Sequence, residues 1–131
     1  MMVAVRNRQR ARKVNVARLK KLAAAFDSKL ETLSIVLVSD AAMARLNLQY
    51  HNVSGTTDIL TFDYGAGQGE LIISVECAAA NARQFHSTLA RELVLYIVHG
   101  LLHLHGYDDC APAQRRQMRA AEQRWLTKLG I

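Results

Sequence analysis

The stretch LVLYIVHGLLHLHGYDD, residues 93–109, joins an apolar run to three histidines and two aspartates. Residues 93–104 predict a largely buried helix, on which His99 and His103 lie four positions apart and share one face. At that spacing two imidazoles can bind one metal ion. Buried histidines are also common as hydrogen-bonded members of a core, and a pair at this spacing arises by chance, so the pair alone does not establish a metal site.

The residues after this helix favour the metal interpretation. Gly106 predicts a left-handed residue that ends the helix and reverses the chain, and Asp109 follows three positions later. His99, His103 and Asp109 then provide three ligands and leave a fourth position for water, as catalytic zinc sites do. Zinc lowers the pKa of bound water to about 7, which makes hydroxide available at neutral pH. We therefore expect one divalent transition metal ion, with Zn²⁺ as the first choice.

Other residues of this region leave alternatives open. Asp108 is the competing third ligand, and His86 and His105 are interpreted as surface residues or as residues that support the ligands. The metzincin proteases share the layout of two helical histidines, a glycine turn and a third ligand. Their general base is a glutamate directly after the first histidine, where this chain has Gly100. A metallohydrolase acting on peptides is therefore the alternative function.

Length and composition predict one domain, residues 1–131. Half of the residues are hydrophobic, 6% are aromatic and one is proline, which is typical of a helix-rich soluble domain. Cys77 and Cys110 are too few and too far apart for a disulfide framework, so we expect a reducing, cytoplasmic location. Residues 93–104 are too short to span a membrane, and the basic N-terminal residues precede no apolar run typical of a secretory signal.

The net charge of +6 is concentrated toward the two ends of the sequence. Residues 1–21 carry eight lysines or arginines and no acid, and the segment after Pro112 carries five against one acid. This pattern predicts a polyanionic partner. Near the start of the sequence, every second residue from 6 to 12 is an arginine: Arg6, Arg8, Arg10 and Arg12. On an extended chain these side chains share one side, where they can bind RNA phosphates. Protection of an edge strand from sheet pairing explains them equally well.

Periodicity and turn residues predict alternating strands and helices. The expected strands are 2–8, 33–38, 59–62 and 71–74, and the expected helices are 14–30, 40–50, 76–85, 88–105 and one that begins at Pro112. Asp40 is expected to accept from the free amides of its helix. The glycines of DYGAGQG, residues 63–69, indicate a turn or a longer loop. Trp125 falls on the apolar stripe of the last helix and is assigned to the core.

Three motifs resemble the YbeY-type endoribonucleases that mature ribosomal RNA. HGLLHLHGYDD is similar to the family signature H-G-x-L-H-L-x-G-Y-D-H, and LNLQYHNVSGTTDILTF, residues 46–62, and GELIIS, residues 69–74, match two further segments in the same order. The resemblance covers roughly residues 33–131. It implies an α+β fold, in which a small mixed sheet packs with about five helices, and a metal site at the end of a central helix.

The resemblance also implies a function. The family members hydrolyse single-stranded RNA in ribosomal RNA maturation and ribosome quality control, so the implied partners are ribosomal RNA and ribosomal or ribosome-associated proteins, without a membrane. His99 and His103 fall on the family's first two metal ligands, and Asp109 stands where the family has a third histidine. An anionic ligand should acidify the metal's water less and favour harder ions such as manganese somewhat more.

A second departure is His51, which stands where the family has an important arginine. An unperturbed imidazole is mostly neutral at pH 7, so this position loses a fixed phosphate clamp. Three interpretations of His51 stay open: a catalytic general acid or base, a residue that binds phosphate only where acidic neighbours keep it protonated, or an exposed loop residue. Asp58 and Thr57 match the family's T-D pair, and Asp58 is expected to orient a loop or a histidine that supports the site. Because of the two departures, a ribosome assembly factor with a structural metal remains a further alternative.

Overall fold

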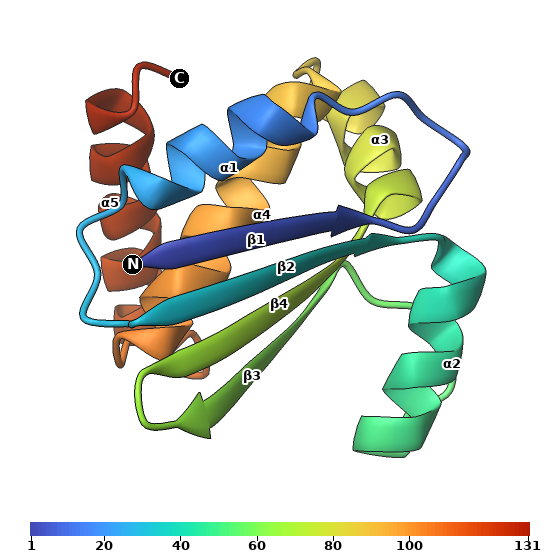
Figure 1. Ribbon diagram of the computed structural model, residues 1–131, viewed down its shortest axis with the longest axis horizontal. Helices are drawn as coiled ribbons and strands as arrows, with labels where there is room; N and C mark the ends of the chain where they lie inside the picture. The colour runs from blue at the N-terminus through green and yellow to red at the C-terminus, as the bar shows by residue number, and fades with distance from the viewer.

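The computed structural model describes all 131 residues as four strands and five helices (Figure 1). In chain order they are β1 (Met2–Asn7), α1 (Val16–Ala24), β2 (Thr32–Val38), α2 (Asp40–His51), β3 (Ile59–Gly65), β4 (Gln68–Ser74), α3 (Val75–Gln84), α4 (Leu89–Leu104) and α5 (Pro112–Lys128). The sheet has the order β1-β2-β4-β3. β1, β2 and β4 are parallel and β3 is antiparallel to β4. The expected α+β fold with a small mixed sheet is therefore confirmed.

The two faces of the sheet are covered by different helices. Alternate strand residues such as Ile35, Leu71 and Ile73 form the main core with α4, and α1, α3 and α5 complete it. The residues between them in the strands, such as Val36 and Ile72, form a smaller cluster with α2. In Figure 1 the strands cross in front of α4, and α2 lies at one end of the sheet.

Helix α4 is held unusually close to β4. Its apolar residues fill the main core, and Thr88 caps its first turn by accepting from the Arg91 amide at 3.1 Å. At Gly100 a Cβ atom would lie only 2.5 Å from Leu71 Cδ2, so glycine is required for this approach. The same contact aims position 100 at β4, and His99 and His103 lie on the neighbouring face of α4, beside β3. No helix of the chain combines the length and apolar composition needed to cross a bilayer.

The boundaries differ from expectation in two places near helices. The helix expected at 14–30 stops at Ala24, although Phe26 beyond it is still buried. Further along, His105 binds the Ser28 hydroxyl and the Lys29 amide, which fastens this non-helical segment to the end of α4. Ser39, rather than Asp40, caps α2 by accepting from the Ala42 amide. Asp40 instead accepts from the Ser74 hydroxyl at the start of α3.

Strands β3 and β4 are longer than the sequence pattern predicts. β3 and β4 run through most of DYGAGQG, and Gly65 pairs with Gln68 across a tight turn. The two residues in the turn, Ala66 and Gly67, both have positive φ, 52° and 75°. This is the backbone that a two-residue hairpin requires, so the glycines make a sharp reversal rather than a longer loop.

Candidate metal centre

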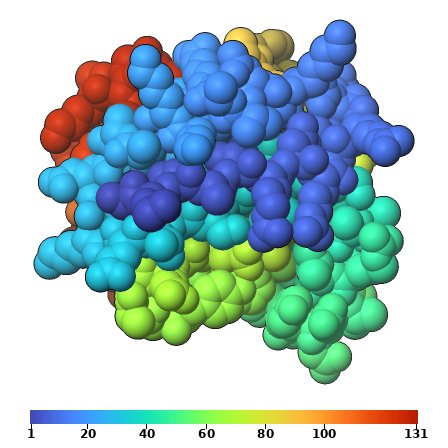
Figure 2. All heavy atoms as spheres, in the orientation of Figure 1, coloured from blue at the N-terminus to red at the C-terminus, as the bar shows by residue number.

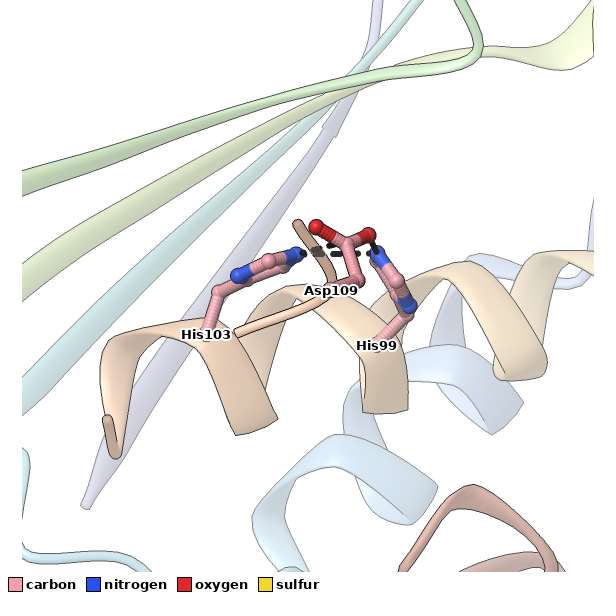
Figure 3. A group of neighbouring side chains, drawn as sticks. All are labelled: His99, His103 and Asp109. Carbon is pink, nitrogen blue, oxygen red and sulfur yellow. Dashed lines mark hydrogen bonds and ion pairs between the residues drawn. The ribbon is translucent and has the colours of Figure 1, made fainter. Parts of the chain in front are cut away.

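Three potential ligand atoms meet at the C-terminal end of α4. His99 and His103 project from one face of the helix, and Asp109 returns to them from the segment that follows (Figure 3). The two Nε2 atoms are 3.0 Å apart, and Asp109 Oδ2 is 3.5 Å from each of them. The structure thus brings together the three residues predicted as metal ligands.

The return of Asp109 follows from the end of the helix. Gly106 has a φ of 95°, and the Tyr107 amide donates to the Leu102 carbonyl at 3.0 Å, which closes the expected left-handed helix end. Asp108 stays exposed and accepts from the Asp109 amide at 2.7 Å. This bond orients the segment, so Asp109 rather than Asp108 reaches the histidines.

The spacing of the three atoms fits a small divalent cation. Zinc binds imidazole nitrogen and carboxylate oxygen at 2.0–2.2 Å, so two ligands of a tetrahedral ion are about 3.4 Å apart. The observed separations of 3.0 and 3.5 Å bracket that value. The ligand side chains are 23%, 27% and 42% exposed for His99, His103 and Asp109. A centre of three ligands that is open on one side is typical of catalytic rather than structural zinc sites.

Glu122 of α5 supports this centre, although no sequence pattern predicted it as a site residue. Its Oε1 lies 2.8 Å from His99 Nδ1, and a carboxylate can only accept, so Nδ1 carries the proton and Nε2 presents its lone pair to the other ligands. This hydrogen bond also raises the pKa of His99, against the opposing effect of burial. The signal in the sequence was that Glu122 is the one acid after Pro112 and lies next to the apolar stripe of α5.

An open cleft of about 480 Å³ lies beside the ligands. Its opposite wall comes from β3 and the residue before it: Asp58, Ile59, Thr61 and Asp63. Asp58 Oδ1 accepts from the Ile59 amide at 2.8 Å and makes no hydrogen bond with either histidine. Asp58 therefore shapes the start of β3 and adds a carboxylate to the cleft, and its support of a histidine ligand stays a prediction.

His51 lies away from the metal centre. It is the last residue of α2, and its ring lies 6.3 Å from that of Phe62 on β3. Alternation along β3 places Phe62 on the α2 face, whereas Thr61 and Asp63 line the cleft on the α4 face. The structure thus does not bring His51 to the metal ligands, and its predicted role as general acid or base has no geometric support there.

The remaining histidines are outside the ligand group. His105 donates from Nδ1 to the Leu101 carbonyl at 2.6 Å and accepts at Nε2 from Ser28 and Lys29, so it fastens the 28–29 segment to the end of α4. His86 is exposed in the turn between α3 and α4, where its φ is 53°. Trp125 stacks on Phe26 with ring centroids 4.2 Å apart, which confirms its place beside the core.

The four N-terminal arginines do not form one continuous row. β1 ends at Asn7, and the buried Gln9 side chain then bonds Asn7 and both the amide and the carbonyl of Arg12. Arg6 and Arg8 line a groove on the α2 face of the sheet, whereas Arg10 and Arg12 lie in the exposed turn that follows. Their binding to RNA stays a prediction.

Comparison with known proteins gives consistent matches over most of the chain. A family described as Endoribonuclease YbeY matches residues 4–130. Relatives of that name from Heliobacterium modesticaldum and Phocaeicola vulgatus are 39% and 36% identical over 116 residues; the matches cover 76% and 86% of this chain and 70% and 84% of those relatives. A third, from Thermodesulfovibrio yellowstonii, is 33% identical and covers 97% of this chain and 96% of the relative. The solution structure of a Thermotoga maritima protein has the same fold, with a TM-score of 0.65 at 23% identity over 98% of this chain and 89% of that one.

Proposed function

This chain belongs to the endoribonuclease YbeY family, and from that premise and the geometry at the end of α4 we propose that it is a metal-dependent endoribonuclease that cuts single-stranded RNA internally. The observation that carries the proposal is the convergence of His99, His103 and Asp109 beside an open cleft. The proposed cofactor is one divalent transition metal ion, with Zn²⁺ as the first choice. A bound ion of this kind supplies positive charge to a phosphoryl oxygen and acidifies water.

The residues at this centre would have the following roles. His99, His103 and Asp109 hold the ion, and Glu122 keeps the proton of His99 on Nδ1 so that Nε2 stays free to bind. Asp58 and Asp63 are the other carboxylates that line the cleft, and they are the groups placed to accept a proton there. Since Asp109 brings a negative charge to the centre, manganese should compete with zinc better than it would at a site of three histidines.

The cellular role proposed here follows from the family. We propose that the substrate is ribosomal RNA and that the protein acts in the cytoplasm, in ribosomal RNA maturation and ribosome quality control, together with ribosomal or ribosome-associated proteins. The basic ends of the sequence support an RNA partner, because they would neutralise backbone phosphates.

The arrangement argues against cleavage of peptides. A metzincin needs a glutamate at position 100, but a Cβ there would meet Leu71 at 2.5 Å and would point into the sheet. The partial exposure of the three ligands favours a catalytic metal over the purely structural metal of an assembly factor, since structural sites are closed by four protein ligands.

Metal analysis and nuclease assays of purified variants test the proposal. The wild-type protein should contain close to one equivalent of transition metal and should cleave unstructured RNA but not casein, and a chelator should abolish cleavage. His103→Ala should lose metal and activity while keeping its fold, measured by circular dichroism. His86→Ala, at an exposed histidine outside the centre, is the matched control. A folded, metal-free wild-type protein that cleaves RNA would refute the metal assignment, and unfolding of His103→Ala would support the structural alternative.

A further inference from the structure

Four aromatic side chains gather on the α2 face of the sheet, opposite the metal centre. Tyr50 and His51 end α2, and Phe62 and Tyr64 lie on β3 two residues apart, on the same side of the strand. The rings of Phe62 and Tyr64 are nearly parallel, 5° apart in plane, with centroids separated by 6.1 Å. Tyr50 meets Phe62 edge-on at 5.4 Å. These four residues form an aromatic strip, of which Tyr50 is 57% and Tyr64 62% exposed.

A basic groove adjoins the strip. Its volume is about 550 Å³, and Arg6, Arg8 and Arg45 line it above an apolar floor. Figure 2 shows this side of the molecule. Strand β1 is dark blue and the β3–β4 hairpin is yellow-green, and α2, in green, lies at one end of the sheet. We call this groove, which the three arginines line, the arginine groove.

One hydrogen-bonded residue joins the groove to the strip. Glu70 is the single acid that lines the arginine groove, and it accepts from the Tyr64 hydroxyl at 2.7 Å and from Ser34 at 2.9 Å. Both of its carboxylate oxygens therefore accept from hydroxyl groups, which holds the Tyr64 ring in place, and the three arginines outnumber this one negative charge in the groove. Three positive charges and a row of fixed, exposed rings consequently lie on one continuous surface.

We propose that this surface binds single-stranded RNA, with bases stacked on the aromatic strip and phosphates bound in the arginine groove. Exposed rings stack on unpaired bases of any sequence, and guanidinium groups bind phosphates through paired N–H donors. Rings and arginines also occur in protein interfaces, but nearly parallel exposed rings beside a groove of three arginines match the bases and phosphates that alternate along a single strand. The inference rests on the proposed function, which makes RNA the substrate, and it adds a second contact region to the cleft.

The topology connects this surface to the metal centre by a short route. β3 is the edge strand of the sheet, and its side chains alternate between the two faces. Phe62 and Tyr64 belong to the aromatic strip, whereas Thr61 and Asp63 line the cleft beside His99. An RNA strand held on the strip therefore reaches the metal centre by passing over the free edge of one strand. A duplex keeps its bases paired inside, so it offers the rings nothing to stack on.

Binding of a single-stranded 12-nucleotide DNA tests the strip without cleavage, because an endoribonuclease does not cut it. Fluorescence anisotropy is measured with metal-loaded protein and a fluorescein label. The double variant Tyr50→Leu/Tyr64→Leu should bind at least about tenfold more weakly than wild type, while Phe85→Leu, at an exposed ring on α3's end, should bind as wild type. The affinity for the corresponding duplex should be the same for wild type and the double variant.

The arginine groove is tested by the salt dependence of the same binding. Arg8→Gln/Arg45→Gln removes two charges, so the slope of log affinity against log salt should fall by about 1.4, while Arg124→Gln on α5 should leave it unchanged. The inference would be overturned if both double variants kept native circular dichroism spectra and bound the oligonucleotide with the affinity and salt dependence of wild type. That result would favour a protein partner for this face.

The outcomes separate this inference from the proposed function. A protein that binds the oligonucleotide through the aromatic strip but cleaves no RNA would refute the proposed function alone. A protein that cleaves RNA, with a KM for a 12-nucleotide RNA that is unchanged in Tyr50→Leu/Tyr64→Leu, would refute the strip alone.

Discussion

The hydrogen bond between Glu122 and His99 gives the sharpest quantitative prediction. It is 2.8 Å long, joins two partly buried side chains, and fixes the proton on the ring nitrogen that faces away from the other ligands. Replacing residues that orient a metal-bound histidine weakens metal affinity by about 10–100-fold. In Glu122→Gln the amide oxygen can still accept from Nδ1 but the charge is lost, so we expect about a tenfold weaker zinc affinity. Glu122→Ala removes the acceptor as well, so about a hundredfold loss is expected.

Competition with a chromophoric chelator measures both affinities. Glu31→Gln, which neutralises an exposed carboxylate outside the centre, controls for the change in net charge and should bind zinc as wild type. Equal zinc affinity in wild type and Glu122→Ala would refute the reasoning, because it would mean that Nδ1 needs no fixed proton for Nε2 to bind.

The same contact predicts a pH dependence in the metal-free protein. Glu122 raises the pKa of His99 in the folded state above its unfolded value of about 6.5. The pair therefore stabilises the fold most below about pH 6.5, while Glu122 is still ionised, and this contribution is lost as the pH rises through the folded pKa of His99. The difference in melting temperature between wild type and Glu122→Gln should be larger at pH 5.5 than at pH 8. A difference that grows with pH would contradict the assignment.

Three further changes test other parts of the structure. Gly100→Ala places a Cβ 2.5 Å from Leu71 and should lower the free energy of unfolding by about 1–3 kcal/mol in urea titrations; an unchanged midpoint would show that α4 can move away from β4. His105→Ala removes bonds to Ser28 and the neighbouring backbone and should cost about 1–3 kcal/mol of stability with full metal content, so loss of metal would contradict its purely structural role. Asp109→His replaces the anionic ligand by a neutral imidazole and should raise the preference for zinc over manganese in competition experiments. An unchanged ratio of zinc to manganese affinity would show that Asp109 is not a ligand.

Much of the metal centre was accessible from the sequence because it is local. The spacing of His99 and His103 on one helix, and the helix-ending conformation of Gly106, are set by backbone geometry that short-range patterns describe. Glu122 was missed because its contact with His99 depends on the angle at which α5 packs on α4. The spacing of residues within one helix does not predict that packing angle.

Features that depend on tertiary context were predicted less well. The apolar spacing through Phe26 predicted a longer first helix, but α1 ends at Ala24 and Phe26 enters the core from the bend that follows, so the spacing reported burial and not helix length. The arginine row assumed an extended chain, and the side chain of Gln9 folds it after β1. His51 ends α2, and the sheet face that α2 covers is decided by tertiary packing, so the sequence could not separate His51 from the metal centre.

The centre has a consequence for how the protein folds. All four of its groups come from one continuous segment, residues 99–122, whereas each parallel strand pair joins residues that are about 30 or more positions apart. Local contacts close with little loss of chain entropy, and distant ones form slowly. The three ligands therefore come together as soon as α4 and the turn after it form, and an ion that binds only this folded centre stabilises the whole domain, since α4 shares one core with the sheet.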